Sequence, residues 1–316
     1  MDRRQFIETS LLGGAGFALL SYFNCGPKNQ QTVAPLPKRK LGRTNEQLSI
    51  IGFGGILVRN MEQPVANDLV ARAYDHGVNY FDIAPSYGNA QQQLGPALRP
   101  YRDKCFLACK TLARSRDGAE RELHESLKIL ETDYFDLYQL HALTTPDDVE
   151  QAFGPDGAME AFLKARQEGK LRFIGFSAHS ETAALMAMER FAFDTVLFPI
   201  NFVCWFNGNF GPKVVAAASE KGMGILALKA LAFGPVPEGT KKPYPKLWYI
   251  PVEDMEFANL ALRFTLSQGT TAAIPPGDET FFWRAVSMAK AFQPITEQEI
   301  ATWKQKIHGA APLFKS

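Results

Sequence analysis

Short apolar segments alternate with longer segments of helical periodicity along most of the chain. Short apolar runs between turn residues predict buried strands, and a 3.6-residue repeat predicts amphipathic helices. The strands are predicted at 48–53, 78–83, 105–110, 135–141, 171–176, 195–200, 224–229 and 272–275. The helices are predicted at 64–76, 90–98, 118–131, 156–169, 180–191, 212–221, 253–268 and 279–292. One further helix begins at Thr296, whose spacing from Glu299 is that of a capping box.

This alternation predicts the α/β class and a single (β/α)8 TIM barrel over residues 35–316. Segments 38–40 and 47–50 predict a short N-terminal hairpin before the barrel, and the helix at Thr296 is a C-terminal extra helix. A doubly wound sheet is the alternative that periodicity alone leaves open. The dinucleotide fingerprint of that fold is absent, because no G-x-G-x-x-G follows an early strand.

The segment after the seventh predicted strand, residues 232–251, is long and rich in proline. Long loops in compact domains are often functional, so this segment is a candidate lid over a substrate site. Aromatic candidates for the wall of that site are Trp205, Phe206, Trp248 and Tyr249, with core or loop packing as the alternative for each.

The first 34 residues have the composition of a targeting segment. Arg3 and Arg4 precede a glycine-rich apolar run at 11–23, which is too short to span a membrane as a helix. This pattern resembles the twin-arginine export signal, so we expect an exported, periplasmic protein that engages the twin-arginine export machinery. A buried N-terminal helix is the alternative. Cleavage after Ala34 is favoured over a lipid anchor at Cys25, and strong membrane association is expected only with that anchor.

Composition and charge fit a globular protein without a charged partner. The chain has 316 residues, 46% of them hydrophobic, and 34 Lys and Arg residues against 33 Asp and Glu. Without residues 1–34 the charges balance, so nothing predicts binding to nucleic acid. Cys105 and Cys109 lie too far apart along one strand for a disulfide, and with Cys204 they are predicted to be buried thiols.

Four polar residues follow the carboxyl ends of consecutive predicted strands: Asp82, Tyr87, Lys110 and His141. In a barrel these strand ends converge on one face, where active sites lie. Reduction of a carbonyl needs an acid beside the developing alkoxide, and a tyrosine can serve if a nearby cation lowers its pKa. Lys110 would supply the cation, Asp82 would hold Lys110, and His141 would orient the carbonyl by a hydrogen bond.

The sequence resembles the aldo-keto reductase family over residues 36–290. The resemblance rests on several separated motifs in the same order. They are Leu41-Gly-Arg-Thr44, Ile51-Gly-Phe-Gly-Gly55, Asn79-Tyr-Phe-Asp-Ile-Ala-Pro-Ser-Tyr-Gly88, Leu94-Gly95, Lys110, Asp133-Tyr-Phe-Asp-Leu-Tyr-Gln-Leu-His141, Gly169-Lys-Leu-Arg-Phe-Ile-Gly-Phe-Ser177 and Ala261-Leu-Arg-Phe264. The family implies a (β/α)8 barrel that binds NADP(H) in an extended pose without a Rossmann domain.

The resemblance also assigns roles to residues. The catalytic Asp, Tyr, Lys and His of the family correspond to Asp82, Tyr87, Lys110 and His141. Cofactor-binding positions correspond to Gly55, Ser177, Asn201, Lys229, Ala230 and Leu231, and no metal is implied. The chain departs from the family pattern at Ala178 and His179, where many members have Asn after the serine. It also lacks the cation that grips a 2′-phosphate after the eighth strand, with Arg284 the nearest.

These features predict an exported NAD(P)(H)-dependent oxidoreductase acting on a small carbonyl or sugar-like substrate, with Tyr87 as general acid or base. NADP(H) is favoured as cofactor by the resemblance, and NAD(H) is possible because the 2′-phosphate cation is missing. One alternative is a nicotinamide-binding barrel that acts as a regulatory or binding subunit. Another is a sugar-modifying enzyme that recycles a tightly held cofactor.

Overall fold

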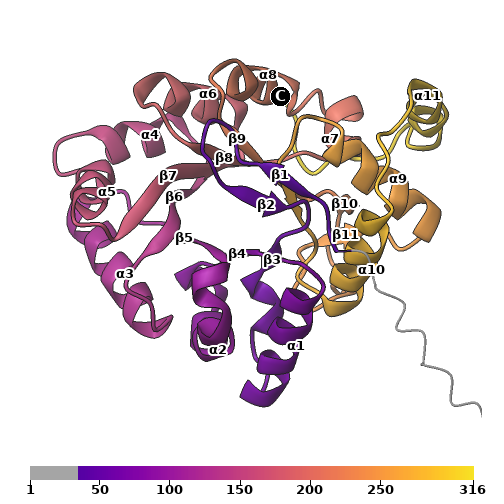
Figure 1. The fold of residues 1–316 in the computed structure, drawn as a ribbon. Helices are drawn as coiled ribbons and strands as arrows, with labels where there is room; N and C mark the ends of the chain where they lie inside the picture. Colours follow the sequence, from indigo (N-terminus) through magenta and orange to yellow (C-terminus); the bar gives the residue numbers. More distant parts are fainter. Residues whose placement is uncertain (1–34) are drawn as a thin grey trace, which may run out of the picture. The chain divides into compact units, whose positions relative to one another are not determined.

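The computed structural model describes residues 35–316. Its central strands are β3 (Phe53–Gly54), β4 (Tyr80–Asp82), β5 (Phe106–Thr111), β6 (Phe135–Leu143), β7 (Leu171–Ala178), β8 (Thr195–Pro199), β9 (Gly224–Leu228) and β12 (Ala272–Ile274). They pair in parallel in the order β12-β9-β8-β7-β6-β5-β4-β3, and a parallel bridge between Ile51 and Ala273 joins the two edges. The structure is therefore a (β/α)8 barrel, as predicted, and the doubly wound alternative is wrong (Figure 1).

The predicted helices surround this barrel (Figure 1). They are α1 (Gln63–Asp75), α2 (Ala90–Leu98), α3 (Arg116–Ile129), α5 (Ala158–Gln167), α6 (Glu181–Arg190), α8 (Pro212–Glu220), α9 (Met255–Leu266) and α10 (Glu279–Lys290). The extra helix is α11 (Glu297–Lys306). Its capping box is present, because the Thr296 side chain accepts a bond from the Glu299 backbone and the Glu299 side chain accepts one from Thr296.

The structure differs from the sequence prediction at four places. The predicted strand 48–53 is divided between the hairpin strand β2 (Gln47–Ser49), which pairs with β1 (Lys38–Lys40), and the barrel strand β3. Two short helices, α4 (Pro146–Phe153) and α7 (Phe202–Asn207), lie in segments for which no helix or strand was predicted. The predicted lid segment holds an antiparallel ribbon of β10 (Ala232–Pro235) and β11 (Tyr249–Pro251). Each element is too short to show a clear periodicity.

Side-chain alternation along the strands fills the barrel interior. Tyr80, Phe106, Ala108 and Leu137 are buried there with apolar residues from the other strands. Their outward neighbours pack instead against the helices, in a separate and larger cluster. Because alternation has a period of two, residues two positions further along each strand face the same interior.

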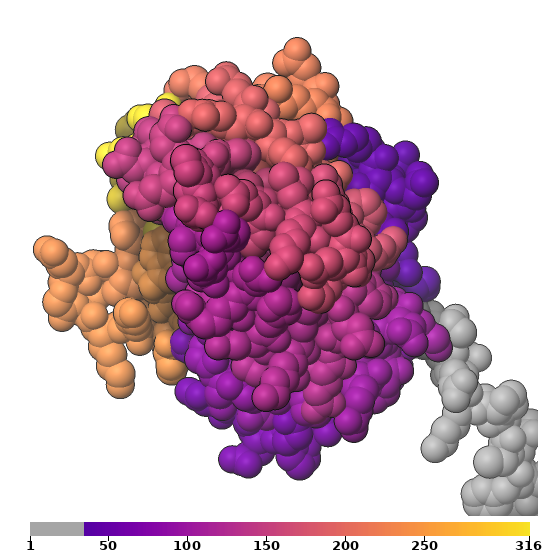
Figure 2. Space-filling view, turned by 90° about the vertical axis from the view of Figure 1, so that its left-hand side faces the viewer, coloured from indigo at the N-terminus to yellow at the C-terminus, as the bar shows by residue number. Residues whose placement is uncertain are grey.

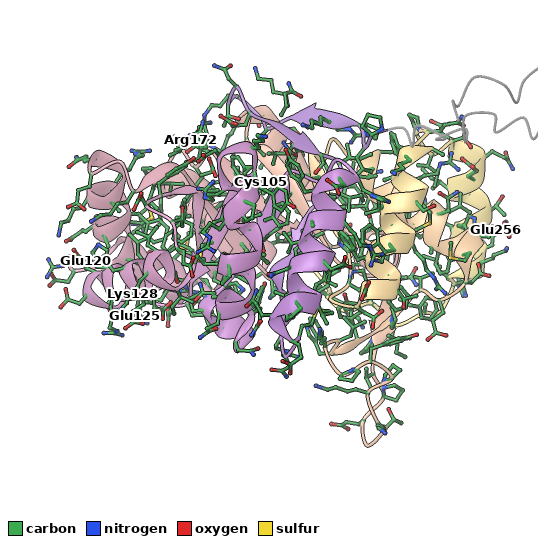
Figure 3. The ribbon with its side chains drawn as sticks, turned by 60° about the horizontal axis from the view of Figure 1, so that its bottom comes forward. Cys105, Glu120, Glu125, Lys128, Arg172 and Glu256 are labelled. Atoms are coloured by element: carbon green, nitrogen blue, oxygen red, sulfur yellow. The ribbon has the colours of Figure 1, made fainter. Side chains whose placement is uncertain are left out.

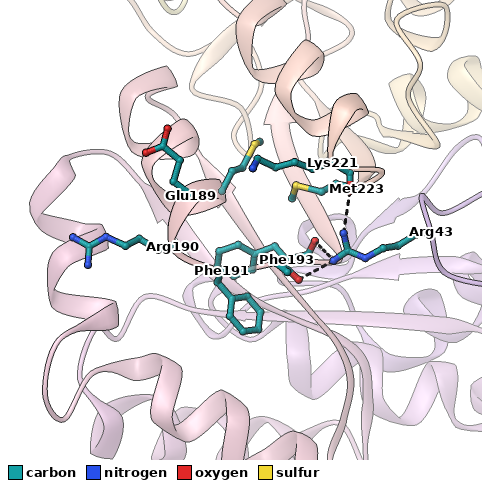
Figure 4. Close-up of a pocket in the computed structure, with 9 residues that line it drawn as sticks. Arg43, Glu189, Arg190, Phe191, Phe193, Lys221 and Met223 are labelled. Carbon is teal, nitrogen blue, oxygen red and sulfur yellow. Dashed lines mark hydrogen bonds between the residues drawn. The ribbon is translucent and has the colours of Figure 1, made fainter.

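The N-terminal hairpin covers one end of the barrel (Figure 1). Leu41 and Leu48 are fully buried and pack into the interior cluster from this end. Arg43 fastens the hairpin by donating bonds to the carbonyl oxygens of Ala192, Phe193 and Lys221 at 2.8–3.0 Å. These bonds border a surface hollow of about 420 Å³ at this end, shown in Figure 4. We therefore regard this end as structural.

A buried ion network joins neighbouring strands near the same end. Asp136, which is 2% exposed, accepts bonds from Arg102 at 2.9 Å, from Arg172 at 2.5 Å and from the backbone of Leu107 at 2.8 Å. Arg172 also binds Glu46 of the hairpin loop. Figure 3 shows the labelled Arg172 close to the hairpin, on the opposite side of the barrel from the projecting lid segment. Asp136 thus links β5, β6, β7 and the hairpin electrostatically.

The three cysteines of the described segment, Cys105, Cys109 and Cys204, are free and buried, as predicted. Burial raises the pKa of Cys105 and of Cys109 to about 12, so both remain thiols at neutral pH. No helix within residues 35–316 has the length and hydropathy needed to cross a membrane. The predicted signal residues Arg3 and Arg4 lie outside the described part of the chain, as does Cys25.

Replacing Asp136 by Asn should destabilise the protein strongly, because it leaves the Arg102 guanidinium buried without its carboxylate. The expected loss is about 3–5 kcal/mol in the free energy of unfolding, measured by urea titration. Asp117→Asn is the matched control. Asp117 pairs with Arg116 but its side chain is 82% exposed, and a loss below about 1 kcal/mol is expected. Equal losses in the two variants would contradict a special role for Asp136.

Candidate active site

Three adjacent strands and one turn bring the predicted catalytic residues together at the end of the barrel opposite the hairpin. Asp82 ends β4, and Lys110 and His141 lie near the carboxyl ends of β5 and β6. Tyr87 ends the 3-10 turn η2 (Pro85–Tyr87) that follows β4 directly. The register places Lys110 beside Gln139 of β6. All four predicted residues therefore share one site.

Asp82 and Lys110 form an ion pair inside the barrel. Their side chains are 2% and 1% exposed, and the Lys110 ammonium donates to Oδ1 of Asp82. The second oxygen of Asp82 accepts bonds from the hydroxyl of Tyr80 at 3.4 Å and from the amide of Gln139 at 3.2 Å. Burial alone would lower the pKa of Lys110, but the charge of Asp82, the neighbouring Tyr87 and the hydrogen bond to Asp82 together outweigh burial and raise that pKa. Lys110 therefore stays protonated.

The sequence analysis missed Tyr80 and Gln139. Both lie two residues before a predicted site residue on the same strand, Tyr80 before Asp82 and Gln139 before His141. Strand alternation was thus the signal that could have found them, because it places them on the same inward face. They satisfy the second oxygen of the Asp82 carboxylate, which would otherwise be buried without a hydrogen-bond partner.

Tyr87 lies beside the ion pair. The Lys110 ammonium is 5.1 Å from the centroid of the Tyr87 ring, and the His141 ring is 6.1 Å away in a perpendicular arrangement. Burial raises the pKa of the Tyr87 phenol, and the charge of Lys110 acts in the opposite direction but is the smaller effect. The net shift is upward, contrary to the expected lowering. The phenol is therefore protonated at neutral pH and can act as a proton donor.

His141 is held as a neutral ring. Burial, followed by the charge of Lys110, lowers the pKa of His141 to about 2, and its buried Nδ1 has no hydrogen-bond partner. Its backbone carbonyl accepts a bond from Arg114 at 2.8 Å. The next residue, Ala142, has a left-handed backbone with φ 54°, and its N–H donates to the hydroxyl of Ser177 at 2.8 Å. This local bend in β6 sets the direction in which the side chain of His141 projects from the strand.

Ser177 and Asn201, both predicted to hold a nicotinamide carboxamide, form hydrogen bonds within the protein. Ser177 supports Ala142, as just described. Asn201 follows β8; its amide donates to the carbonyl of Lys229 at 2.9 Å and to that of Ala232, and its oxygen accepts from Cys204 at 2.9 Å. Asn201 thereby caps α7 and fixes the turn after β9. Their contact with a cofactor stays a prediction.

Lys229 begins the predicted cofactor-binding segment with Ala230 and Leu231, which are both buried. Its backbone is left-handed, with φ 65°. Its ammonium lies 5.0 Å from the ring centroid of Trp248 and 4.9 Å from that of Tyr249. Burial, followed by the charge of Lys110, lowers the pKa of Lys229 to about 8.

Gly55, predicted to bind cofactor, begins the turn η1 (Gly55–Val58) and is buried. A β-carbon at this position would lie 2.2 Å from the side chain of Ile83, so the structure shows a packing requirement for glycine here. Its neighbour Gly54 lines the cavity of the site, whereas Gly55 is not among the lining residues.

A cavity of about 160 Å³ lies over these residues. Asp82, Tyr87 and Lys229 line it, together with Gly54, Ile56, Leu228, Ile274, Pro275, Gly277 and the lid residues 246–249. The volume is below the roughly 300–1,000 Å³ typical of ligand pockets, because the lid lies close over the opening. Lys246 of the lid donates to the carbonyl of Leu57 at 2.5 Å. The segment between β10 and β11 projects from the body as the light-orange protrusion at the left of Figure 2.

His179 is a second histidine at this site and was noted in the sequence only as a departure from the family pattern. It directly follows β7, and its ring stacks on Phe314 near the C-terminus at 5.2 Å. Burial, followed by the charges of Lys229 and Lys110, lowers the pKa of His179 to about 4. Its buried Nε2 has no hydrogen-bond partner.

The neutral state of His141 should be visible by NMR. Its ring nitrogen and carbon signals should remain constant from about pH 8 to about pH 5, because its pKa lies far below that of an ordinary histidine, about 6.5. Free histidine in the same buffer is the reference, and the His141→Gln spectrum assigns the signals. A titration midpoint near pH 6.5 for His141 would contradict this description of the site.

Comparisons with known proteins agree with the fold. The Aldo/keto reductase family matches residues 50–308. The oxidoreductase YqkF of Bacillus subtilis is 33% identical over 45% of this chain and 48% of its own. L-galactose dehydrogenase of Arabidopsis thaliana is 29% identical over 62% of this chain and 66% of its own length. The matches therefore span about half to two thirds of the length of these two relatives. The holo form of aldo-keto reductase AKR11C1 from Bacillus halodurans superposes with a TM-score of 0.69 at 23% identity, over 89% of this chain and 98% of that one. The chain belongs to the aldo/keto reductase family of oxidoreductases.

Proposed function

We propose that the protein is a nicotinamide-dependent oxidoreductase that interconverts a carbonyl and an alcohol, with Tyr87 as general acid or base. The observation that carries the proposal is the buried Asp82–Lys110 pair beside a protonated Tyr87 and a neutral His141. This set provides a proton donor, a fixed cation and a neutral hydrogen-bonding ring within one small space. Family membership supports the same reaction class.

The residues around the cavity have the chemistry that a nicotinamide dinucleotide requires. Leu228 and Ile274 offer apolar surface for a ring, and the cationic Lys229 suits a phosphate. A β-carbon at Gly277 would lie 2.4 Å from Ile56, so the backbone approaches the cavity closely at this point. The cavity is too small for a whole dinucleotide, so binding requires the lid residues 246–249 to move outward. In this proposal the 232–251 segment is a lid.

Each catalytic residue has a defined task in the proposed reaction. When bound, a nicotinamide supplies or accepts the hydride at the carbon of the substrate. Tyr87 delivers a proton to the carbonyl oxygen in the reducing direction and recovers it in the other. Lys110 stabilises the phenolate that remains, and Asp82 keeps Lys110 charged and in place. His141, being neutral, holds the carbonyl oxygen by a hydrogen bond without competing for the proton.

NADP(H) is favoured over NAD(H) in this proposal. The sequence offers no cation directly after the eighth strand, but the lid brings Lys246 to the cavity beside Pro275 and Gly277. A lysine at this point suits a 2′-phosphate. Arg284, the nearest cation in the sequence, donates instead to the carbonyl of Glu253 at 3.1 Å.

A sugar-like substrate is supported by the similarity to L-galactose dehydrogenase.

Tyr87→Phe should reduce carbonyl turnover by about 100-fold or more, because the ring remains while the proton donor is lost. Lys110→Met should also impair turnover, since the phenolate would lose its cation. Turnover with NADPH or NADH is followed by nicotinamide absorbance over a panel of aldehydes and sugars. Cofactor dissociation constants are measured by fluorescence and should be unchanged in Tyr87→Phe.

Tyr101→Phe is the matched control, because it removes a phenol that stacks on Tyr74 between helices rather than in the site. Full turnover by the Tyr87→Phe variant would exclude Tyr87 as the acid. Cofactor binding by wild type without turnover of any carbonyl would support the binding-subunit alternative. Cofactor that co-purifies and is recycled during each turnover would support the sugar-modifying alternative.

We also propose that residues 1–34 direct export through the twin-arginine machinery to the periplasm. The support is the sequence alone, with Arg3 and Arg4 placed before a glycine-rich apolar run. Cleavage after Ala34 would release the protein, whereas lipidation at Cys25 would anchor it.

Replacing both Arg3 and Arg4 by Lys should leave the folded protein in the cytoplasm, because lysine keeps the charge but not the guanidinium pair that the signal requires. Cell fractionation of the native host with a tagged protein measures this. Lys28→Arg, which keeps the charge at the far end of the segment, is the control. Unchanged export of the double variant would contradict the proposal.

A further inference from the structure

The η2 turn borders two cavities. Tyr87 lines the cavity of about 160 Å³ described above, together with Lys229 and Ile274. Pro85 and Ser86, from the same turn, line a second hollow of about 260 Å³. The second hollow shares the turn with the first cavity but none of its lining residues. It is therefore a separate space next to the candidate active site.

His141 lines the second hollow and not the first cavity. Its ring centroid lies 6.1 Å from that of Tyr87. A carbonyl oxygen that receives a hydrogen bond from His141 and a proton from Tyr87 must lie between these two side chains. In the proposed function the cofactor occupies the first cavity, so the rest of the substrate extends past His141 into the hollow.

Glu122 of α3 places a carboxylate in the wall of the hollow. The hydroxyl of Thr111, at the end of β5, donates to Oε2 of Glu122 at 2.6 Å. The same hydroxyl accepts from the backbone N–H of Ala113 at 3.0 Å, which directs its proton toward the carboxylate. Within residues 35–316 no ion pair includes Glu122, and its Oε1 forms no hydrogen bond. The carboxylate is thus held in position with one oxygen left to accept from a ligand.

The rest of the wall is uncharged. Leu112 is 49% exposed although it is a large apolar side chain, and the exposed Ser86 adds a hydroxyl. Arg114, a cation close by in the chain, is not among the lining residues, because it donates to Asp148 at 3.0 Å and to the carbonyl of His141 at 2.8 Å. Apolar surface, a hydroxyl and an acceptor-only carboxylate together suit a compound with C–H faces and several hydroxyl groups.

We propose that this hollow is the substrate subsite, and that Glu122 selects neutral polyhydroxylated carbonyl compounds of monosaccharide size by accepting hydrogen bonds from their hydroxyl groups. This inference rests on the proposed interconversion of a carbonyl and an alcohol. The hollow is close to the lower limit of small-molecule sites, about 300 Å³, which fits such a compound. A substrate carboxylate at the same place is repelled by Glu122, so sugar acids are disfavoured. The ribose of the cofactor is the other source of hydroxyl groups, and the experiment separates the two.

The test compares D-erythrose with butanal, which has the same carbon chain without hydroxyl groups, and D-galactose with D-galacturonate, which carries a carboxylate. In wild type, kcat/KM should favour erythrose and galactose. Glu122→Ala should lower the erythrose-to-butanal ratio of kcat/KM by about 10- to 100-fold, because a hydrogen bond to a charged acceptor is lost. Glu122→Gln keeps an acceptor for Thr111 but removes the charge, so it should raise the galacturonate-to-galactose ratio by about 10-fold. A purely structural role for Glu122 would change all four values in parallel.

A binding measurement gives a readout that does not depend on turnover. Galactitol has the hydroxyl groups of galactose but no carbonyl, and its affinity is measured by NMR titration with and without NADPH. Glu122→Ala should weaken this binding by about 10-fold or more. Glu125→Gln is the matched control, because Glu125 is an exposed residue of the same helix that does not line the hollow. It should leave the ratios and the galactitol affinity unchanged.

Four outcomes separate the possibilities. Unchanged ratios and unchanged galactitol binding in both Glu122 variants would overturn the subsite. A loss of NADPH affinity of about 10-fold or more in Glu122→Gln, with unchanged ratios, would overturn it by assigning Glu122 to the cofactor ribose. A preference for D-galactosamine over D-galactose that is lost in Glu122→Gln would overturn the selection of neutral compounds, because Glu122 would then bind an ammonium. If wild type binds NADPH but reduces none of these compounds, the proposed reaction fails, and the galactitol titration alone then decides whether the subsite exists.

Discussion

The site depends on one ion pair, between Asp82 and Lys110, buried inside a barrel of apolar side chains. Removing two charges from water is costly, and the pair persists because Tyr80 and Gln139 satisfy the second oxygen of the carboxylate. Its presence fixes the charges of the neighbouring groups. Lys110 stays protonated, and burial, aided by the charge of Lys110, keeps His141 neutral. The chemistry that the site can perform follows from these protonation states.

The barrel and the grouping of the candidate catalytic residues at one end of it could be predicted from the sequence because both follow from periodicity. Strand alternation and the parallel arrangement place Asp82, Lys110 and His141 at one end of the barrel without any knowledge of loops. The ribbon β10–β11 and the position of Lys246 could not be predicted, because they depend on how a proline-rich segment folds back over the barrel. The net pKa shift of Tyr87 was also beyond prediction, since burial opposes the charge of Lys110 and only the structure gives their balance.

Two residues with left-handed backbones, Ala142 and Lys229, lie at the candidate active site. Such conformations cost about 1–3 kcal/mol for residues other than glycine, and they persist when the surroundings hold them. Arg114 and Ser177 hold the first, and Asn201 holds the second. The geometry of the site is therefore set by side chains on several strands and loops, rather than by the strand ends alone.

The hairpin at the opposite end has a consequence for when the barrel can close during synthesis. Arg43 donates to the carbonyl groups of Ala192, Phe193 and Lys221. These residues follow Arg43 in the chain by 149, 150 and 178 positions. Ile51, at one edge of the sheet, likewise pairs with Ala273 at the other edge. The barrel closes only when Ala273 is in place. Most of the chain must therefore leave the ribosome before the end of the barrel that the N-terminal hairpin covers can form. Until then, the first strands of the barrel present unpaired edges.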